Sequence, residues 1–125
     1  GKANIENMVH ECKMEDRVLF LGLRNDVPAL LSAFDVMLFT SLFEGMPNAI
    51  IEAQAVNLPC VISDTISPDV RITPDVVQMS LVTSDKEWAA KVIGSRKGQR
   101  GDNSDTIYKA GYSIIETTND LTSLF

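Results

Sequence analysis

The sequence predicts an α/β fold built on an open, doubly wound parallel sheet. Short apolar runs end at turn residues, as buried strands do, and amphipathic stretches of helical length separate them. Strands and helices that alternate in this way form parallel βαβ units with right-handed crossovers. Because 45% of the 125 residues are hydrophobic, the chain can form one domain with its own core.

The first part of the chain predicts two helices and two strands. Apolar residues at helical spacing predict a helix over residues 2–13. The apolar run at residues 17–21 is typical of a buried strand. A second helix is expected after Asn25 or Asp26, which are both good N-cap residues, and a second buried strand at residues 36–40.

The middle of the chain continues this alternation. Residues 47–56 are predicted as a helix because Pro47 suits a first helical position, where no N–H is needed. Residues 59–63 form a third apolar run, and the two prolines of residues 65–74 indicate a loop. A further strand is expected at residues 76–82.

The last part of the chain predicts helices. Ser84 and Glu87 resemble a capping box, and the helix that they open carries Trp88 at a position that favours packing in the core. Residues 95–104 are polar and glycine-rich, which indicates a loop. Two C-terminal helices are expected within about residues 103–125, at 105–114 and 117–124.

Composition and charge exclude several classes of protein. Eleven basic against seventeen acidic residues give a net charge of −6, which argues against a nucleic-acid partner. Cys12 and Cys60 are far apart and fit neither a metal site nor a disulfide framework, so we expect a reducing, cytoplasmic location. No apolar run approaches the roughly 20 residues of a membrane span, and no signal peptide is visible.

The most informative stretch joins the strand at residues 36–40 to the helix at 47–56. Gly45 allows a tight turn and a close approach of the backbone to a ligand. The turn lies at the carboxyl end of a strand, where parallel sheets bind their ligands. The free N–H groups at the helix start and the helix dipole predict a phosphate or pyrophosphate site, made by the backbone of Met46, Asn48 and Ala49.

Two carboxylates flank this predicted anion site. Glu44 precedes the turn, and Glu52 follows Asn48 by four residues on the same helix face. Because carboxylates repel an anion, they are better suited to accept hydrogen bonds from the hydroxyls of a sugar and a ribose. The alternative reading is that both are solvated surface residues.

Four segments in chain order resemble retaining GT-B glycosyltransferases of family 4, which act in bacterial polysaccharide and lipopolysaccharide synthesis. Glu44 and Glu52, separated by seven residues, resemble the paired glutamates of that family. The resemblance is strong over residues 14–64. The other three segments resemble the strand motifs DRVxFLG, AADVFVLPS and GxPVVASD of the family, at residues 17–22, 33–36 and 58–64.

The resemblance implies a Rossmann-like domain, the C-terminal half of a GT-B enzyme, that binds a nucleotide-sugar donor. It implies that Glu44 is catalytic and contacts the donor sugar, and that Glu52 contacts the ribose. The diphosphate would lie against Gly45, Met46, Pro47, Asn48 and Ala49, and the base beside Gly22, Leu23 and Arg24.

The implied reaction is retaining transfer of a sugar from a nucleotide-diphosphate sugar to a hydroxyl acceptor, in cell-surface polysaccharide synthesis. Stabilising the charge of the leaving phosphate would supply most of the catalysis. Because the sequence has no Asp-x-Asp motif, neither a metal nor another cofactor is expected. The family's diphosphate-gripping Arg and Lys and its acceptor domain, which holds a sugar or lipid-linked acceptor, have no counterpart here. We therefore expect residues 1–125 to be one partial domain that is inactive alone.

Other functions stay open at this stage. A sugar-nucleotide epimerase of GT-B architecture would share the donor site, and a non-catalytic Rossmann-like module would share the fold. A dinucleotide binder is disfavoured because the segment after the first strand supplies one glycine, Gly22, of the three required. An incomplete sheet would favour self-association. The basic group Arg96, Lys97 and Arg100 is expected to be a solvated loop, with peripheral contact to an anionic inner membrane face as the second reading.

Overall fold

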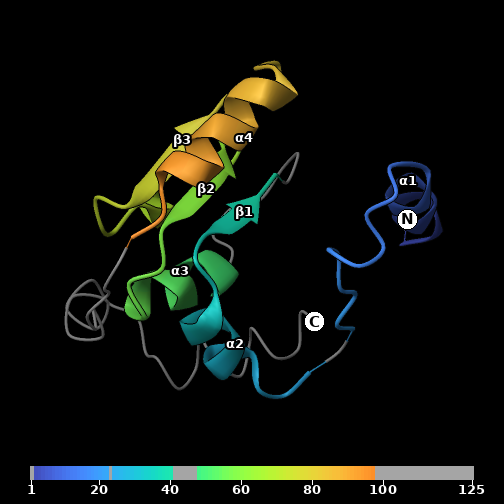
Figure 1. The fold of residues 1–125 in the computed structure, drawn as a ribbon. Coiled ribbons are helices and arrows are strands. Elements are labelled where there is room, and N and C mark those ends of the chain that lie inside the picture. The colour runs from blue at the N-terminus through green and yellow to red at the C-terminus, as the bar shows by residue number, and fades with distance from the viewer. Residues whose placement is uncertain (1, 23, 41–47, 98–125) are drawn as a thin grey trace.

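A parallel three-stranded sheet lies at the centre of the fold (Figure 1). The computed structural model describes residues 2–22, 24–40 and 48–97. The strands β1 (Met37–Phe39), β2 (Cys60–Ser63) and β3 (Val76–Met79) lie in the order β1-β2-β3. Met37 pairs with Cys60, and Cys60 pairs with Val76, so all three strands run in one direction. The predicted α/β class is confirmed.

Helices lie on both faces of this sheet. α2 (Val27–Ala33) and α3 (Asn48–Ala55) contact each other, and α3 also contacts β2. α4 (Asp85–Gly94) lies on the opposite face, since its Trp88 and Val92 line a hollow together with Leu38 of β1. The first helix, α1 (Lys2–Glu11), lies apart from the sheet, and the apolar stripe that predicted it is largely exposed (Figure 1).

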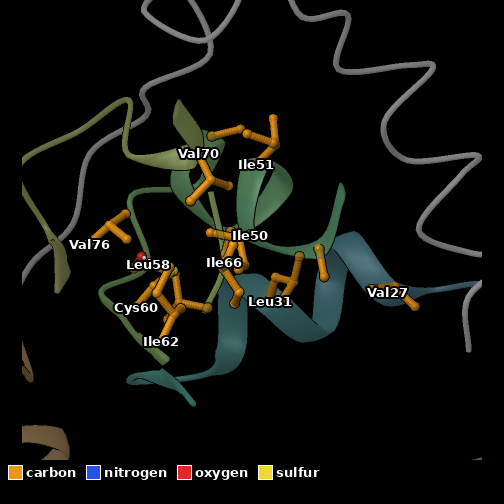
Figure 2. Close-up of a cluster of buried hydrophobic side chains, with 13 residues drawn as sticks. Val27, Leu31, Ile50, Ile51, Leu58, Cys60, Ile62, Ile66, Val70 and Val76 are labelled. Carbon is orange, nitrogen blue, oxygen red and sulfur yellow. Dashed lines mark hydrogen bonds between the residues drawn. The ribbon is translucent and has the colours of Figure 1, made fainter. Parts of the chain in front are cut away.

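The core lies between the sheet and the pair α2–α3 (Figure 2). Every residue of α3 from Ala49 to Ala55 is buried, so this helix has no solvated face. Burial of that many apolar side chains is the main stabilising contribution to such a small fold. The buried members of the core are Val27, Leu31, Ala49, Ile50, Ile51, Ala53, Ala55, Leu58, Cys60, Ile62, Ile66, Val70 and Val76.

The strand predicted at residues 17–21 is wrong. The segment from residue 18 to 21 forms neither helix nor strand, and the Leu19 side chain is 80% exposed. An apolar run becomes a strand only where a neighbouring strand supplies hydrogen bonds, and the described sheet extends no further than β1 on that side. Gly22, which ends the run, has a φ of 65°, a left-handed conformation that favours glycine.

Several local predictions are confirmed around α4. The Ser84 hydroxyl accepts a hydrogen bond from the Glu87 backbone N–H at 3.2 Å, which caps the helix as the capping box predicted. Trp88 is buried, and its indole N–H donates to the carbonyl of Ser80 at 3.1 Å. The two C-terminal helices predicted at 105–114 and 117–124 lie outside the described residues.

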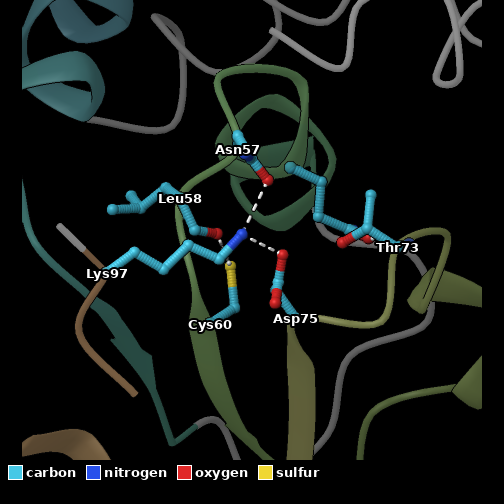
Figure 3. Close-up of polar contacts among 7 residues, drawn as sticks. Asn57, Leu58, Cys60, Thr73, Asp75 and Lys97 are labelled. Carbon is cyan, nitrogen blue, oxygen red and sulfur yellow. Dashed lines mark hydrogen bonds and ion pairs between the residues drawn. The ribbon is translucent and has the colours of Figure 1, made fainter. Parts of the chain in front are cut away.

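Lys97 is not the solvated loop residue that the sequence predicted. Its ammonium donates to the Oδ1 of Asn57 at 3.0 Å and pairs with the carboxylate of Asp75 (Figure 3). Asn57 follows α3 with a φ of 59°, and Asp75 directly precedes β3. Lys97 therefore joins the segment after α4 to the amino-terminal ends of the strands. Arg96 is exposed, as predicted, and Arg100 lies outside the described residues.

Candidate functional site

The candidate site lies where α3 begins, at the carboxyl edge of the sheet. α3 connects β1 to the parallel strand β2, so its N-terminus lies at the end of the sheet where β1 ends. Asn48 is the first residue of α3 and is half-buried, and Ala49 is buried. Glu44, Gly45, Met46 and Pro47, which the sequence assigned to the same site, lie outside the described residues.

Glu52 lies on α3, one turn after Asn48, as the sequence predicted. It is 2% exposed, so the alternative of a solvated surface carboxylate is wrong for this residue. A carboxylate is rarely buried to this extent in an apolar helix unless polar groups of the protein or of a ligand contact it, because transfer out of water is costly. Among the predicted donor-binding residues that the structure describes, Glu52 is the buried charged one.

Arg24, a predicted base-pocket residue, forms an ion pair with Asp26. Its Nε and Nη2 atoms each donate to the Asp26 carboxylate at 2.7 Å, a two-bond arrangement typical of strong Arg–carboxylate pairs. Hydrogen bonds from the guanidinium hold the pKa of Asp26 below its usual value and raise the pKa of Arg24. Asp26 stands at the N-cap of α2, but its side chain makes no capping hydrogen bond because the carboxylate faces Arg24.

A cavity of about 440 Å³ brings two of the predicted segments together. Gly22 and Arg24 line it from one side, and Ala49 of α3 lines it as well. Leu23, which the sequence placed with them, lies outside the described residues. Most of the lining is apolar and comes from residues 19–21, α2 and β1, and Arg24 alone among the described lining residues carries a charge. A mainly apolar cavity suits a ligand that has a ring, and the Arg24 charge at its wall is paired with Asp26.

Sequence reasoning missed Gln54, a polar side chain of α3 whose whole amide is hydrogen-bonded. It is fully buried, and its amide makes four hydrogen bonds to backbone atoms, three of them in residues 70–73. The signal was present, since a glutamine in an apolar helix next to a proline-containing loop has to find partners when it is buried.

Residues 2–22, 24–40 and 48–97 contain no group of three or more His, Cys, Asp or Glu side chains that could hold a metal ion. Over the same described parts of the chain, no helix has the length and apolar character needed to cross a bilayer.

Known proteins resemble the part of the chain that contains the candidate site. The family described as glycosyl transferases group 1 matches residues 1–95. EpsF of Bacillus subtilis (strain 168), named as a glycosyltransferase, is 31% identical over 125 residues, which is 97% of this chain and 33% of EpsF. The Escherichia coli UDP-Gal:alpha-D-GlcNAc-diphosphoundecaprenol alpha-1,3-galactosyltransferase is 48% identical over 58 residues, 46% of this chain and 15% of that enzyme.

A third relative has a different substrate in its name. The N-acetyl-alpha-D-glucosaminyl L-malate synthase of Bacillus anthracis is 40% identical over 57 residues, 46% of this chain and 15% of that protein. The chain thus spans about a third of the length of EpsF, and its matches with the other two relatives each cover 15% of the relative's length. No solved structure matches the chain.

Proposed function

Since the chain belongs to the glycosyl transferases group 1 family, we propose that it carries the nucleotide-sugar donor site of a retaining glycosyltransferase. The observation that carries the proposal is the family match over residues 1–95, which includes α3 with its buried Glu52. The names of the relatives support transfer of a sugar as the reaction class.

In the proposed donor complex, the diphosphate lies at the N-terminus of α3. The backbone N–H groups at this helix start, together with those of Gly45 and Met46, donate to phosphate oxygens. Glu52, one turn along α3, accepts hydrogen bonds from the ribose hydroxyls. Gly22, Leu23 and Arg24 border the base, in agreement with the cavity that Gly22 and Arg24 share with Ala49.

The proposed reaction breaks the bond between the anomeric carbon and the diphosphate oxygen and forms a bond from that carbon to the acceptor oxygen. The hydroxyl proton of the acceptor leaves with the departing diphosphate, and the anomeric configuration is retained. Glu44 accepts hydrogen bonds from the donor sugar and thereby orients the anomeric carbon. The N–H groups and the dipole of α3 stabilise the charge that develops on the leaving phosphate.

The proposed acceptor is a sugar or a lipid-linked sugar in the assembly of a cell-surface polysaccharide. The name of the E. coli relative, whose acceptor is a diphosphoundecaprenol-linked sugar, supports an acceptor of this kind. Because the chain spans about a third of EpsF, we propose that residues beyond this chain hold the acceptor.

The variant Glu44→Ala in the full-length natural protein tests the proposed catalytic role. We expect turnover of the donor to fall by a factor of about 100 or more, as when one transition-state contact is removed. Release of nucleotide diphosphate and chromatography of the sugar product measure it. The matched control is Glu87→Ala, which changes an exposed carboxylate on α4. Turnover in Glu44→Ala equal to that of the control would overturn the assignment.

A further inference from the structure

The connection from β2 to β3 depends on a side chain of α3. Residues 64–75 make this parallel crossover, and their one regular element is the 3-10 turn η1 (Pro68–Val70). Val70 and Thr73 of the crossover are buried, so their backbone groups cannot rely on water. An irregular buried segment needs partners from elsewhere in the fold.

Gln54 supplies those partners through every hydrogen-bonding position of its amide. Its Nε2 atom donates to the carbonyl oxygens of Ile50, at 3.2 Å, and Val70, at 2.8 Å. Its Oε1 atom accepts from the backbone N–H groups of Ile72, at 2.9 Å, and Thr73, at 2.8 Å. A primary amide has two donor hydrogens and two acceptor lone pairs, so the Gln54 amide is fully used.

No other side chain of similar size can make this set of bonds. Methionine or leucine would leave the Val70 carbonyl and the N–H groups of Ile72 and Thr73 without these hydrogen bonds. Glutamate has no N–H to donate to the Val70 carbonyl. Because Ile50 is one turn earlier on α3, the same amide is fixed to its own helix and to the crossover. Figure 2 shows Val70 of the crossover close to α3.

Glu52 lies on the other side of α3 from Gln54. Two residues correspond to a rotation of about 200° around a helix axis, so the two side chains point in nearly opposite directions. Both are buried, at 2% and 0% exposure. Apolar contacts of α3 with the core are non-directional, whereas the three hydrogen bonds from Gln54 to the crossover require one orientation of the helix.

We propose that Gln54 is a positioning residue that fixes the rotation of α3 and thereby the place of the Glu52 carboxylate. The bonds of Gln54 to Val70, Ile72 and Thr73 set which face of α3 is turned to the crossover. Glu52 is then held toward the opposite side. The claim about position rests on these contacts alone, and its consequence for ligand binding rests on the proposed function.

Gln78 of β3 offers a matched control. Its Nε2 atom donates to the carbonyl oxygen of Ile66 at 2.9 Å, at the start of the same crossover. Gln78 therefore also fastens the crossover through an amide, but to β3 rather than to α3. The variants Gln54→Met and Gln78→Met remove the two amides with a similar change in shape.

The test is NMR of the whole chain with ¹³C-labelled glutamate side chains. In Gln54→Met we expect a displaced Glu52 carboxyl resonance and exchange of the Ile72 and Thr73 amide hydrogens about tenfold faster or more. In Gln78→Met we expect the Glu52 resonance to stay in its wild-type place. An unchanged Glu52 resonance in folded Gln54→Met, or an equal displacement in both variants, would overturn the proposal.

Hydrogen exchange at the Gln54 amide of the wild-type chain tests the proposal even if the variants do not fold. The two Nε2 hydrogens of Gln54 must exchange slowly with water and show cross-relaxation with residues of the crossover. Fast exchange of these hydrogens would overturn the proposal by itself.

Ligand binding by the folded variants separates this inference from the proposed function. In the full-length protein, we expect Gln54→Met to weaken nucleotide-diphosphate binding about tenfold and Gln78→Met to leave it within about twofold. Equal weakening in both would count against a special role of Gln54. If the wild-type protein bound no nucleotide, the proposed function would fail, while the NMR result would still decide the role of Gln54.

Discussion

At the scale of single residues, the two cysteines of the chain differ in burial and therefore in reactivity. Cys60 is fully buried at the start of β2, and its S–H donates to the carbonyl oxygen of Leu58 at 3.4 Å. Burial, with a smaller contribution from the charge of Asp75, raises the pKa of Cys60 from 9.0 to about 12. Cys12 is exposed. Since the thiolate is the reactive form, only Cys12 should react in the folded chain.

We expect a disulfide thiol reagent at pH 8 to modify one thiol per folded chain and two in denaturant. Absorbance of the released thiol and mass spectrometry of the labelled chain measure the number of modified thiols. The raised pKa of Cys60 also affects stability: its contribution is complete below pH 9.0 and declines as the pH rises toward about 12. Modification of Cys60 at the same rate as Cys12 would show that β2 is accessible.

The pair Arg24–Asp26 gives a second prediction for single residues. In Arg24→Gln, the Asp26 carboxylate loses its charged donors, so the pKa of Asp26 should rise toward its usual value of 3.8. In the wild type this lowered pKa contributes stability above pH 3.8 that is lost as the pH falls through the lower value. A ¹³C NMR titration of the Asp26 carboxyl measures the shift. An identical titration in both proteins would disprove the ion pair in solution.

Residue types drew attention to the buried carboxylate of Glu52 on α3 but not to the nearby amide of Gln54. Glu52 stood out because a charge in an apolar helix is unusual, and the structure places it on α3 as expected. Gln54 stands two positions away, but its partners belong to a crossover of 12 residues whose path no local pattern predicts. Hydrogen bonds between segments so far apart in sequence depend on packing, which periodicity does not report.

At the scale of elements, the contacts of Lys97 with Asn57 and Asp75 fix the segment after α4 to the sheet. We expect Lys97→Met to lower the free energy of unfolding by about 1 kcal/mol, since it removes one ion pair and one hydrogen bond at a partly exposed site. Lys91→Met, in the last turn of α4, is the control because that side chain is exposed. Urea denaturation followed by circular dichroism measures both. Equal stability of the two variants would mean that these contacts contribute nothing.

Helices and strands were predicted well where local signals and tertiary contacts agree. The capping box at Ser84 and the apolar runs of β1, β2 and β3 each lead to the expected element. Residues 17–21 carry an equally apolar run, yet they form no strand in the described part of the chain. A strand depends on a partner for its hydrogen bonds, and apolar composition alone does not supply one.

At the scale of the whole molecule, the fold class followed from the alternation of elements, and the parallel direction of the strands is the reason that a ligand is expected at their carboxyl edge. Gly22 and Arg24 line one cavity with Ala49, more than 20 positions away; the family resemblance grouped these residues around one donor, whereas no local pattern of the sequence does. The roles of Glu44, Gly45, Met46 and Pro47 stay predictions, since these residues lie outside the described parts of the chain.

The most direct test of the donor site is calorimetric titration of the full-length protein with UDP, GDP and ADP. We expect one diphosphate to bind selectively, and Glu52→Gln to weaken it by about 10- to 100-fold through loss of charged hydrogen bonds to the ribose. Glu52→Gln keeps the shape of the buried side chain, and Glu87→Gln, at an exposed position of α4, is its control. Binding of no diphosphate, or equal binding by wild type and Glu52→Gln, would contradict a donor site at α3.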